Sequence, residues 1–173
     1  LPRVEELFEA RTPKKPAVMA EYDGVVRIHP GETANVNDVI LTTDEKDEVI
    51  KYQIPYGMRL IVNDGDHVVK GQALTEGYMA PLDILKINGI EAVYDYIVRE
   101  VQKVYRSQNV DVDDKHVEVI TRQMLRKVRI DDVGDTNLLI GSLTDRLEFE
   151  ADANGWSVRT FGMDGVQTHS YGK

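Results

Sequence analysis

The sequence predicts an α+β fold in which a small β unit is followed by a helical segment. From Ala17 to about Leu74, short apolar runs with strand-like patterning alternate with glycine, asparagine, aspartate and proline. After Pro81, the apolar residues recur at helical spacing instead. We therefore expect a leading segment at residues 1–16, a β unit at 17–80, a helical segment at 81–130 and an irregular tail at 131–173, of which 155–173 carries no assignment.

Composition limits the classes of function. The chain has 173 residues, of which 42% are apolar, enough to build a core. Its net charge of -9 argues against a broad electrostatic grip on nucleic acid, so any DNA contact must be local. The absence of cysteine excludes disulfides, thiolate zinc sites and cysteine nucleophiles, and suits a cytoplasmic protein. No apolar run has membrane-spanning length and no signal-peptide pattern occurs, so we expect no membrane partner.

The first element is a short helix. In PRVEELFEAR, residues 2–11, Val4, Leu7 and Phe8 fall at helical spacing, and the following prolines end any helix. Because the chain starts at Leu1 rather than at methionine, we expect it to be a piece of something longer.

The β unit contains the most distinctive spacing. VNDGDHVVKGQALTEG, residues 62–77, has the G-D-x-V-x-x-G-Q-x-L pattern of a barrel-sandwich hairpin. Gly65 can adopt positive φ in one turn, Lys70-Gly71-Gln72 supplies a second turn, and Val68-Val69 forms the short strand between them. The segment that starts at Gly24 is its expected partner. This predicts a small barrel-sandwich hybrid, either a scaffold or a carrier of a cofactor.

The carrier hypothesis has one candidate, Lys46. Thr43-Asp44-Glu45-Lys46 is similar to the acidic turn that presents a lipoyl or biotinyl lysine. However, Glu45 separates the lysine from Asp44, and two further acidic residues follow it. A solvated hairpin tip explains Lys46 as well.

Two amphipathic helices follow. The first is expected from about Ile90 to Ser107, and the second starts where Asp113 or Asp114 can cap it. The packing stripe of the first should consist of Ile90, Val93, Tyr94, Ile97, Val101, Val104 and Tyr105. The buried face of the second should consist of Val117, Ile120, Met124, Leu125 and Val128.

Catalytic and metal-binding patterns are sparse. The histidines, His29, His67, His116 and His169, are scattered and form no H-E-x-x-H motif, so we expect no metal centre. The pairs Asp113-Asp114 and Asp131-Asp132 could bind a divalent ion, but acidic residues at a helix start are more often caps. The chain has no phosphate-binding loop, no G-x-G-x-x-G and no G-x-S-x-G.

A basic cluster stands out near the end of the second helix. It consists of Arg122, Arg126, Lys127 and Arg129. Arg122 and Arg126 are four residues apart, on one helix face away from the apolar stripe. That face is either solvated or docked on an acidic or phosphate partner.

Three stretches resemble one family. They are LPRVEELFEARTPKKPAVMAEYDGVV at 1–26, PLDILKINGIEAVYDYIVREVQKVYRSQNV at 81–110 and DDKHVEVITRQMLRKVRI at 113–130. The last contains D-K-H-x-E-V-I-x-R-Q-M-L-R-K, a string that helix propensity does not explain. In this order, from about Leu1 to Asn154, the chain resembles the beta-prime (β′) subunit, the largest catalytic subunit of bacterial DNA-dependent RNA polymerase.

The resemblance implies a place within that subunit. Residues 1–16 are similar to the end of the trigger-loop helix and its linker, and the β unit is similar to the jaw, which flanks the downstream DNA channel. Family members use a barrel-sandwich hybrid there without an attached cofactor, which favours the scaffold over the carrier. After Asn154 the tail departs from the family pattern, so we expect a divergent or foreign terminus.

The resemblance also implies site residues and partners. Arg3, Arg11, Lys14 and Lys15 are expected near downstream duplex DNA, where phosphate contacts hold register without reading sequence; simple linkage to the acidic jaw is the alternative. The three-aspartate metal signature is absent, so the isolated chain should be inactive, with Mg²⁺ and Zn²⁺ bound elsewhere in the intact enzyme. The implied partners are the beta, alpha, omega and sigma subunits, DNA, and phage or host transcription regulators, at a cytoplasmic, nucleoid-associated location.

Overall fold

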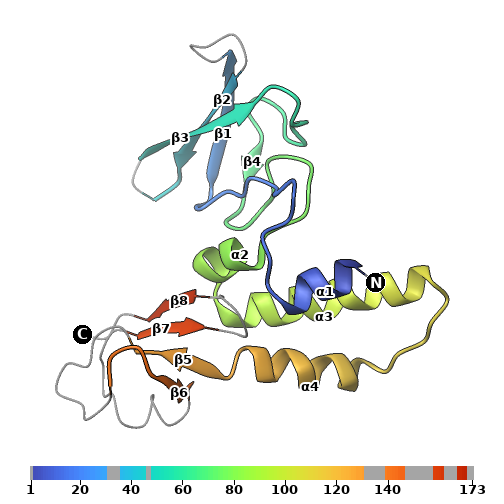
Figure 1. Cartoon of the computed structure of the whole chain (residues 1–173). Coiled ribbons are helices and arrows are strands. Elements are labelled where there is room, and N and C mark those ends of the chain that lie inside the picture. The colour runs from blue at the N-terminus through green and yellow to red at the C-terminus, as the bar shows by residue number, and fades with distance from the viewer. Residues whose placement is uncertain are drawn as a thin grey trace. The chain divides into compact units, whose positions relative to one another are not determined.

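The computed structural model of the chain describes residues 2–30, 36–45, 48–130, 139–146, 158–161 and 167–170. Its helices and antiparallel sheets confirm the α+β class (Figure 1). Within these residues, no helix combines the length and the apolar character needed to cross a lipid bilayer. The chain divides into two compact units, a sheet unit (Pro13–Met79) and a helix unit (Leu1–Thr12 with Ala80–Lys173).

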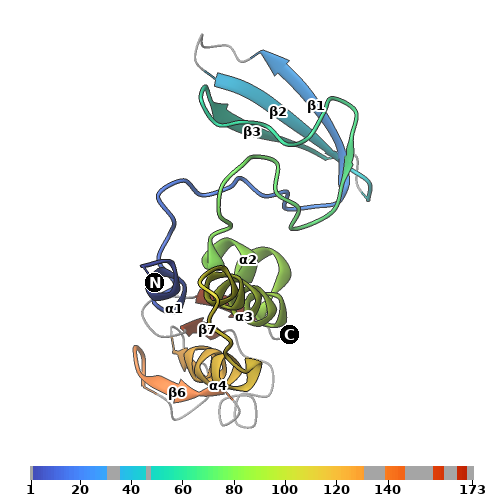
Figure 2. The same cartoon turned by 90° about the vertical axis from the view of Figure 1, so that its right-hand side faces the viewer.

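The sheet unit is built on one curled antiparallel sheet with the strand order β3-β2-β1-β4. Its strands are β1 (Gly24–Pro30), β2 (Val36–Thr43), β3 (Val49–Pro55) and β4 (His67–Val68). Figure 2 shows β1, β2 and β3 side by side. β1 pairs with β2 along its whole length and also with β4, so the segment starting at Gly24 is the partner of the 62–77 hairpin, as expected.

The core of the sheet unit is aliphatic. Along the long strands, most buried residues are separated by more exposed ones, because successive side chains face opposite sides of a sheet. The buried side chains include Val26, Val39, Leu41, Ile54, Val68 and Leu74. Two of these come from the 62–77 hairpin, which therefore closes over the core that the longer strands supply.

The turns of the 62–77 hairpin adopt the expected backbone conformations. Gly65 and Gly71 have φ angles of 86° and 83°, a region that glycine enters without strain. The strand between them is displaced by one residue from the predicted Val68-Val69, because β4 consists of His67 and Val68, and Val69 is exposed. The Val69 amide donates to the side-chain carbonyl of Gln72 at 3.1 Å, so the turn begins there.

Asp64 ties this hairpin to β1. Its carboxylate accepts hydrogen bonds from the Ile28 amide at 2.8 Å and from the Arg27 guanidinium at 3.2 Å. Both contacts favour the ionised form and so hold the pKa of Asp64 below its ordinary range. The hydrogen bond from the Ile28 amide has the larger effect, and the Arg27 guanidinium adds to it.

Gly24 allows β1 to approach β2 closely at its first residue. A Cβ atom added at Gly24 would lie 2.1 Å from the Thr42 carbonyl oxygen, so no other residue fits without backbone movement. Gly24 also pairs with Val68 of β4, so its backbone lies between β2 on one side and β4 on the other.

The two ends of the sheet unit are joined to each other. Pro16 and Tyr78 form a parallel bridge. The Ala17 amide donates to the Tyr78 carbonyl at 3.0 Å, and the Tyr78 amide donates to the Lys15 carbonyl at 3.3 Å. Gly77, with φ of 135°, makes the approach possible, because a Cβ there would lie 2.5 Å from the Lys15 oxygen.

The helix unit contains α1 (Pro2–Phe8), α2 (Pro81–Asn88), α3 (Ile90–Ser107) and α4 (Asp114–Met124), with α1, α2 and α4 all packing on α3 (Figures 1 and 2). Gly89, with φ of 85°, ends α2 and precedes α3. The predicted range of α3 is confirmed, and its buried residues are Val93, Tyr96, Ile97, Val101 and Gln102. Of the two capping candidates of α4, Asp113 is the N-cap, since its side chain accepts from the Lys115 amide.

The predicted register of α4 is wrong in part. The helix ends at Met124, whereas the predicted apolar face continued to Val128. Ile120, expected in the core, is 44% exposed. Thr121 takes the buried position instead, because its hydroxyl donates to the Val117 carbonyl at 2.9 Å and is satisfied without water.

A second antiparallel sheet completes the helix unit, with the order β6-β5-β7-β8. Its strands are β5 (Lys127–Arg129), β6 (Leu143–Asp145), β7 (Val158–Phe161) and β8 (Gln167–Ser170). The sequence predicts a helical segment up to Ile130 and no regular element beyond it, so β5 and the three strands that follow differ from that expectation. Strands of three or four residues are too short to show a period, and their pairing depends on contacts distant in the chain.

Candidate functional site

The basic residues expected near DNA occupy different settings, and Arg3 is the least exposed of them. Its guanidinium forms an ion pair with Glu6 at 2.8 Å and donates to the Tyr96 hydroxyl at 3.0 Å, while its side chain is only 15% exposed. Burial raises the pKa of Tyr96, with the charge of Arg3 acting in the opposite direction. Arg3 therefore connects α1 to α3 within the helix unit.

Arg11, Lys14 and Lys15 are exposed. Arg11 follows α1 in the helix unit and forms ion pairs with Glu9 and, at 3.9 Å, with Glu5. Surface pairs of this kind contribute little to stability, so the guanidinium can exchange partners at small cost. Lys14 and Lys15 belong to the sheet unit.

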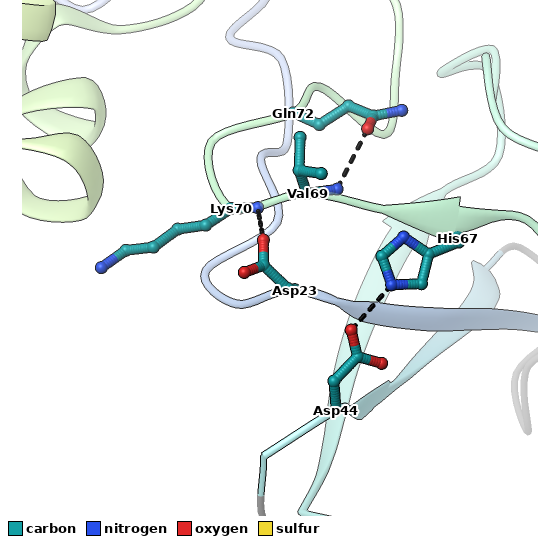
Figure 3. A network of polar contacts seen from close by, with 6 residues as sticks. All are labelled: Asp23, Asp44, His67, Val69, Lys70 and Gln72. Carbon is teal, nitrogen blue, oxygen red and sulfur yellow. Dashed lines mark hydrogen bonds and ion pairs between the residues drawn. The ribbon is translucent and has the colours of Figure 1, made fainter.

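Polar contacts support the turns around the 62–77 hairpin (Figure 3). The Lys70 amide donates to the Asp23 carboxylate at 2.6 Å, and the ring of His67 contacts the Asp44 carboxylate at 2.7 Å. In Figure 3 the Lys70 side chain points away from these contacts. The contacts made by the Lys70 and Val69 amides therefore hold the backbone of the turn that follows β4.

The carrier candidate Lys46 lies outside the described residues. Beside it, the Thr43 amide donates to the Glu48 carbonyl at 2.9 Å, and the Glu48 amide donates to the Thr43 hydroxyl at 3.1 Å. These bonds close the base of the turn between β2 and β3.

The part of the chain that the structure describes contains no cluster of three or more histidine and acidic side chains able to hold a metal ion. Asp113 is occupied as the cap of α4. The pair Asp131-Asp132 and the side chain of His169 fall outside the described residues.

The predicted basic cluster is divided between two places. Because α4 ends at Met124, Arg126 lies just beyond the helix rather than on its face. Arg122 and Arg126 nevertheless line one hollow of about 740 Å³, together with Arg146, which follows β6. We call this the arginine hollow. Lys127 and Arg129 lie on β5, where they pair with Asp145 and Leu143 of β6.

The remaining walls of the arginine hollow mix apolar and acidic groups. Ile90 and Tyr94 come from the start of α3, and Leu125 follows α4. Glu91 and Asp145 supply carboxylates. A cation bordered by apolar surface is less hydrated than one in open solvent, so its interaction with a buried anion is stronger.

Two contacts fix the arginine side of the hollow. The Arg126 Nε atom donates to the Asp145 carboxylate, which is 15% exposed. The Arg146 amide donates to the Arg126 carbonyl at 2.9 Å, so Arg146 is held beside Arg126. Arg122 is exposed and forms no ion pair with any residue that the structure describes.

The charges around Tyr94 affect the pKa of its hydroxyl group. Desolvation raises its pKa, the carboxylate of Glu118 adds to the rise, and the guanidinium of Arg122 opposes it. Arg122 is therefore close enough to Tyr94 to act on its hydroxyl group.

Sequence reasoning did not identify Tyr94, Asp145 or Arg146 as members of this site. Tyr94 was assigned to the packing stripe of α3, and the other two lie after Ile130, where no element was predicted. A charged pair at the end of a three-residue strand is a weak signal, and the pairing of β5 with β6 brings Asp145 and Arg146 to Arg126.

Comparison with known proteins identifies similar chains. The family model described as RNA polymerase Rpb1, domain 5, matches residues 6–171. The chain is 55% identical over 150 residues to the DNA-directed RNA polymerase subunit beta' of Finegoldia magna, covering 87% of this chain and 12% of the relative. It is 55% identical over 152 residues to the subunit of that name from Acetivibrio thermocellus, covering 88% of this chain and 13% of the relative.

These matches leave one expectation open and another without support. The family model continues to residue 171, whereas the alignments with the two β′ relatives extend over 150 and 152 residues, so the departure of the tail after Asn154 stays a prediction. None of the matches supports a lipoyl or biotinyl carrier modified on Lys46. The chain spans about an eighth of the length of these curated relatives.

Proposed function

This chain belongs to the RNA polymerase Rpb1 domain 5 family and corresponds to a segment of the bacterial β′ subunit, and from this premise we propose that it forms the jaw beside downstream duplex DNA. The main support for this proposal is the match of residues 6–171 to the family model, together with 55% identity to β′ subunits. In this role the segment supports DNA-templated RNA synthesis without catalysing it alone. Its site of action is the cytoplasm, at the nucleoid.

The proposal assigns the sheet unit a scaffold role as a barrel-sandwich hybrid. Its support is the aliphatic core closed by the 62–77 hairpin and the positive φ of Gly65 and Gly71 at the hairpin turns. The polar contacts of Asp23 and Asp44 with the 62–77 hairpin add to this support.

The proposed partners are the beta, alpha, omega and sigma subunits and transcription regulators. The Mg²⁺ ions of nucleotidyl transfer and the Zn²⁺ of the subunit would be bound elsewhere in the intact enzyme.

The proposed DNA contacts are made by Arg11, Lys14 and Lys15. Their exposure supports this role, and a guanidinium or ammonium group can meet a phosphate without reading sequence. Arg3 has a different part in the proposal. Because its guanidinium is already bound to Glu6 and Tyr96, we assign it to positioning α1.

Salt-dependent DNA binding tests the proposed contacts. The isolated chain should bind duplex DNA weakly and without sequence preference, and Arg11→Ala with Lys15→Ala should weaken binding at low salt. It should also lower the slope of log affinity against log salt by about 2. The measurement is fluorescence anisotropy of a labelled duplex over a range of salt concentrations.

A matched double variant controls for net charge. Arg106→Ala with Lys70→Ala removes one exposed cation from each unit, as the test pair does, and should leave the affinity nearly unchanged. If both double variants bind DNA equally well, Arg11 and Lys15 do not contact it.

Reconstitution tests the wider role. A polymerase core whose β′ subunit lacks its own jaw segment would be assembled with this chain, and the lifetime of elongation complexes in moderate salt would be measured. A restored lifetime is expected if the chain docks as the jaw. An unchanged lifetime with a folded chain would contradict the proposal that the chain acts there without covalent continuity.

A further inference from the structure

Arg122 borders the arginine hollow in a chain that is acidic overall. The sequence has 30 acidic residues against 21 lysines and arginines. Within the same hollow, Arg126 is bound by Asp145. Arg122 forms no ion pair with a described residue, although it borders the same hollow and faces Tyr94.

The surroundings of Arg122 include apolar surface that is accessible from the hollow. Ile90, Tyr94 and Leu125 line it. Val119 lies one turn before Arg122 on the outer face of α4 and is 61% exposed. A ligand reaching Arg122 can therefore bury apolar groups at the same time.

We propose that the arginine hollow is a docking site for an acidic peptide segment of a partner protein, in which a carboxylate binds Arg122 and a neighbouring aromatic or aliphatic side chain packs on Tyr94 and Leu125. A volume of about 740 Å³ lies in the range of sites that enclose several side chains of a ligand. Guanidinium groups match carboxylates with two parallel hydrogen bonds, which fixes the direction of the bound segment.

The chemistry of the hollow favours a peptide over nucleic acid. Glu91 and Asp145 stand among the arginines and would repel the closely spaced phosphates of a DNA or RNA backbone. A peptide can place a single carboxylate at Arg122 and an apolar side chain beyond it.

The hollow is also preorganised on one side. The ion pair of Arg126 with Asp145 and the hydrogen bond from the Arg146 amide hold that wall before any ligand arrives. Less ordering on binding means that more of the contact energy is retained as affinity. This inference does not depend on the proposed DNA contacts, which involve other residues.

The test uses the full chain and a fluorescein-labelled peptide of sequence EEFEE, with anisotropy as the readout. Comparison peptides are EEGEE, which lacks the aromatic group, and KKFKK, which reverses the charge. We expect EEFEE to bind more tightly than EEGEE, and KKFKK not to bind. Arg122→Glu should weaken EEFEE binding by at least about tenfold, which corresponds to about 1.4 kcal/mol.

A matched variant separates a local effect from net charge. Arg106→Glu makes the same charge change at an exposed residue of α3 that does not line the hollow, and should change the affinity by less than about twofold. Circular dichroism of both variants checks that they are folded. Tyr94→Ala should reduce the advantage of EEFEE over EEGEE, because the aromatic partner on the protein is then missing.

Several outcomes would overturn the proposal. These are no binding of EEFEE, equal losses for Arg122→Glu and Arg106→Glu, and equal affinity for EEFEE and EEGEE. If a short DNA duplex displaces EEFEE and its own binding requires Arg122, the hollow is a nucleic-acid site and the peptide assignment is wrong.

Discussion

Two isoleucines in neighbouring helices give a direct test of the register described above. Ile97 in α3 is fully buried, whereas Ile120 in α4 is 44% exposed, although the apolar pattern places both in the core. Replacing each with alanine removes the same atoms from the same kind of backbone. Any difference in cost therefore reports on burial alone.

The expected costs differ widely. Truncation of a buried isoleucine typically costs about 2–5 kcal/mol, because a cavity is added to the lost transfer free energy. Ile97 lies in α3, which packs against α1, α2 and α4, so the site cannot collapse easily and we expect about 3–4 kcal/mol. For Ile120→Ala we expect a change below about 1 kcal/mol, because little burial is lost and alanine is the better helix former.

Urea unfolding followed by far-UV circular dichroism measures both values. All of α1 to α4 belong to the helix unit, so the helical signal reports on that unit rather than on the sheet unit. A lower midpoint at unchanged slope identifies a change in stability. Equal costs for the two variants, or a larger cost for Ile120→Ala, would refute the register of α4.

The other predictions concern the close contact of β1 with β2 at Gly24, the carboxylate of Asp64 and the partly buried guanidinium of Arg3. Gly24→Ala should destabilise the sheet unit by about 2–3 kcal/mol in thermal unfolding, because a Cβ would lie 2.1 Å from the Thr42 carbonyl oxygen. Asp64→Asn should reduce the fall in the free energy of unfolding at acid pH, as measured by calorimetry over a range of pH values. The lowered pKa of Asp64 means that its stabilisation is present at neutral pH and is lost as the pH falls through that pKa. Arg3→Met should cost about 1–3 kcal/mol in urea unfolding, and less when Tyr96→Phe is already present, because the two groups share a hydrogen bond.

Each of these predictions has a control and a contrary result. Gly57 has positive φ but open space around its Cβ position, so Gly57→Ala should cost only about 1 kcal/mol of backbone strain. If Gly24→Ala and Gly57→Ala cost the same, the contact with the Thr42 carbonyl oxygen is not the cause of the destabilisation. Asp111→Asn removes an exposed carboxylate that accepts no hydrogen bond from the described residues, and the pH profile should then keep its shape. Strict additivity of the Arg3 and Tyr96 changes would show that their contact contributes nothing.

Local patterns predicted the long elements well. The apolar spacing from Ile90 gave the full range of α3, because a helix of that length repeats its buried face several times. The glycines of the 62–77 hairpin predicted its turns, since positive φ is a property of single residues. The same reasoning failed at Ile120 and Thr121, because a threonine whose hydroxyl bonds within its own helix can replace an apolar core residue.

The candidate site was accessible to sequence reasoning only in part. Arg122 and Arg126 were identified from their charge and spacing, but Tyr94 and Asp145 were not. Those two residues reach the arginine hollow through the packing of α3 on α4 and the pairing of β5 with β6, which depend on contacts between distant segments. No short-range pattern encodes such contacts.

The bridge between Pro16 and Tyr78 has a consequence for how the chain folds. Docking α1 on α3 closes a loop that contains the whole of Pro13–Met79. When the bridge has formed, the effective loop between Phe8 and Ile90 is reduced from about 80 residues to about 20, and the free-energy cost of closure falls by about 1 kcal/mol. Folding of the sheet unit thus favours folding of the helix unit through chain connectivity alone. Insertions between Ala17 and Gly77 should keep this effect as long as the bridge between Pro16 and Tyr78 still forms.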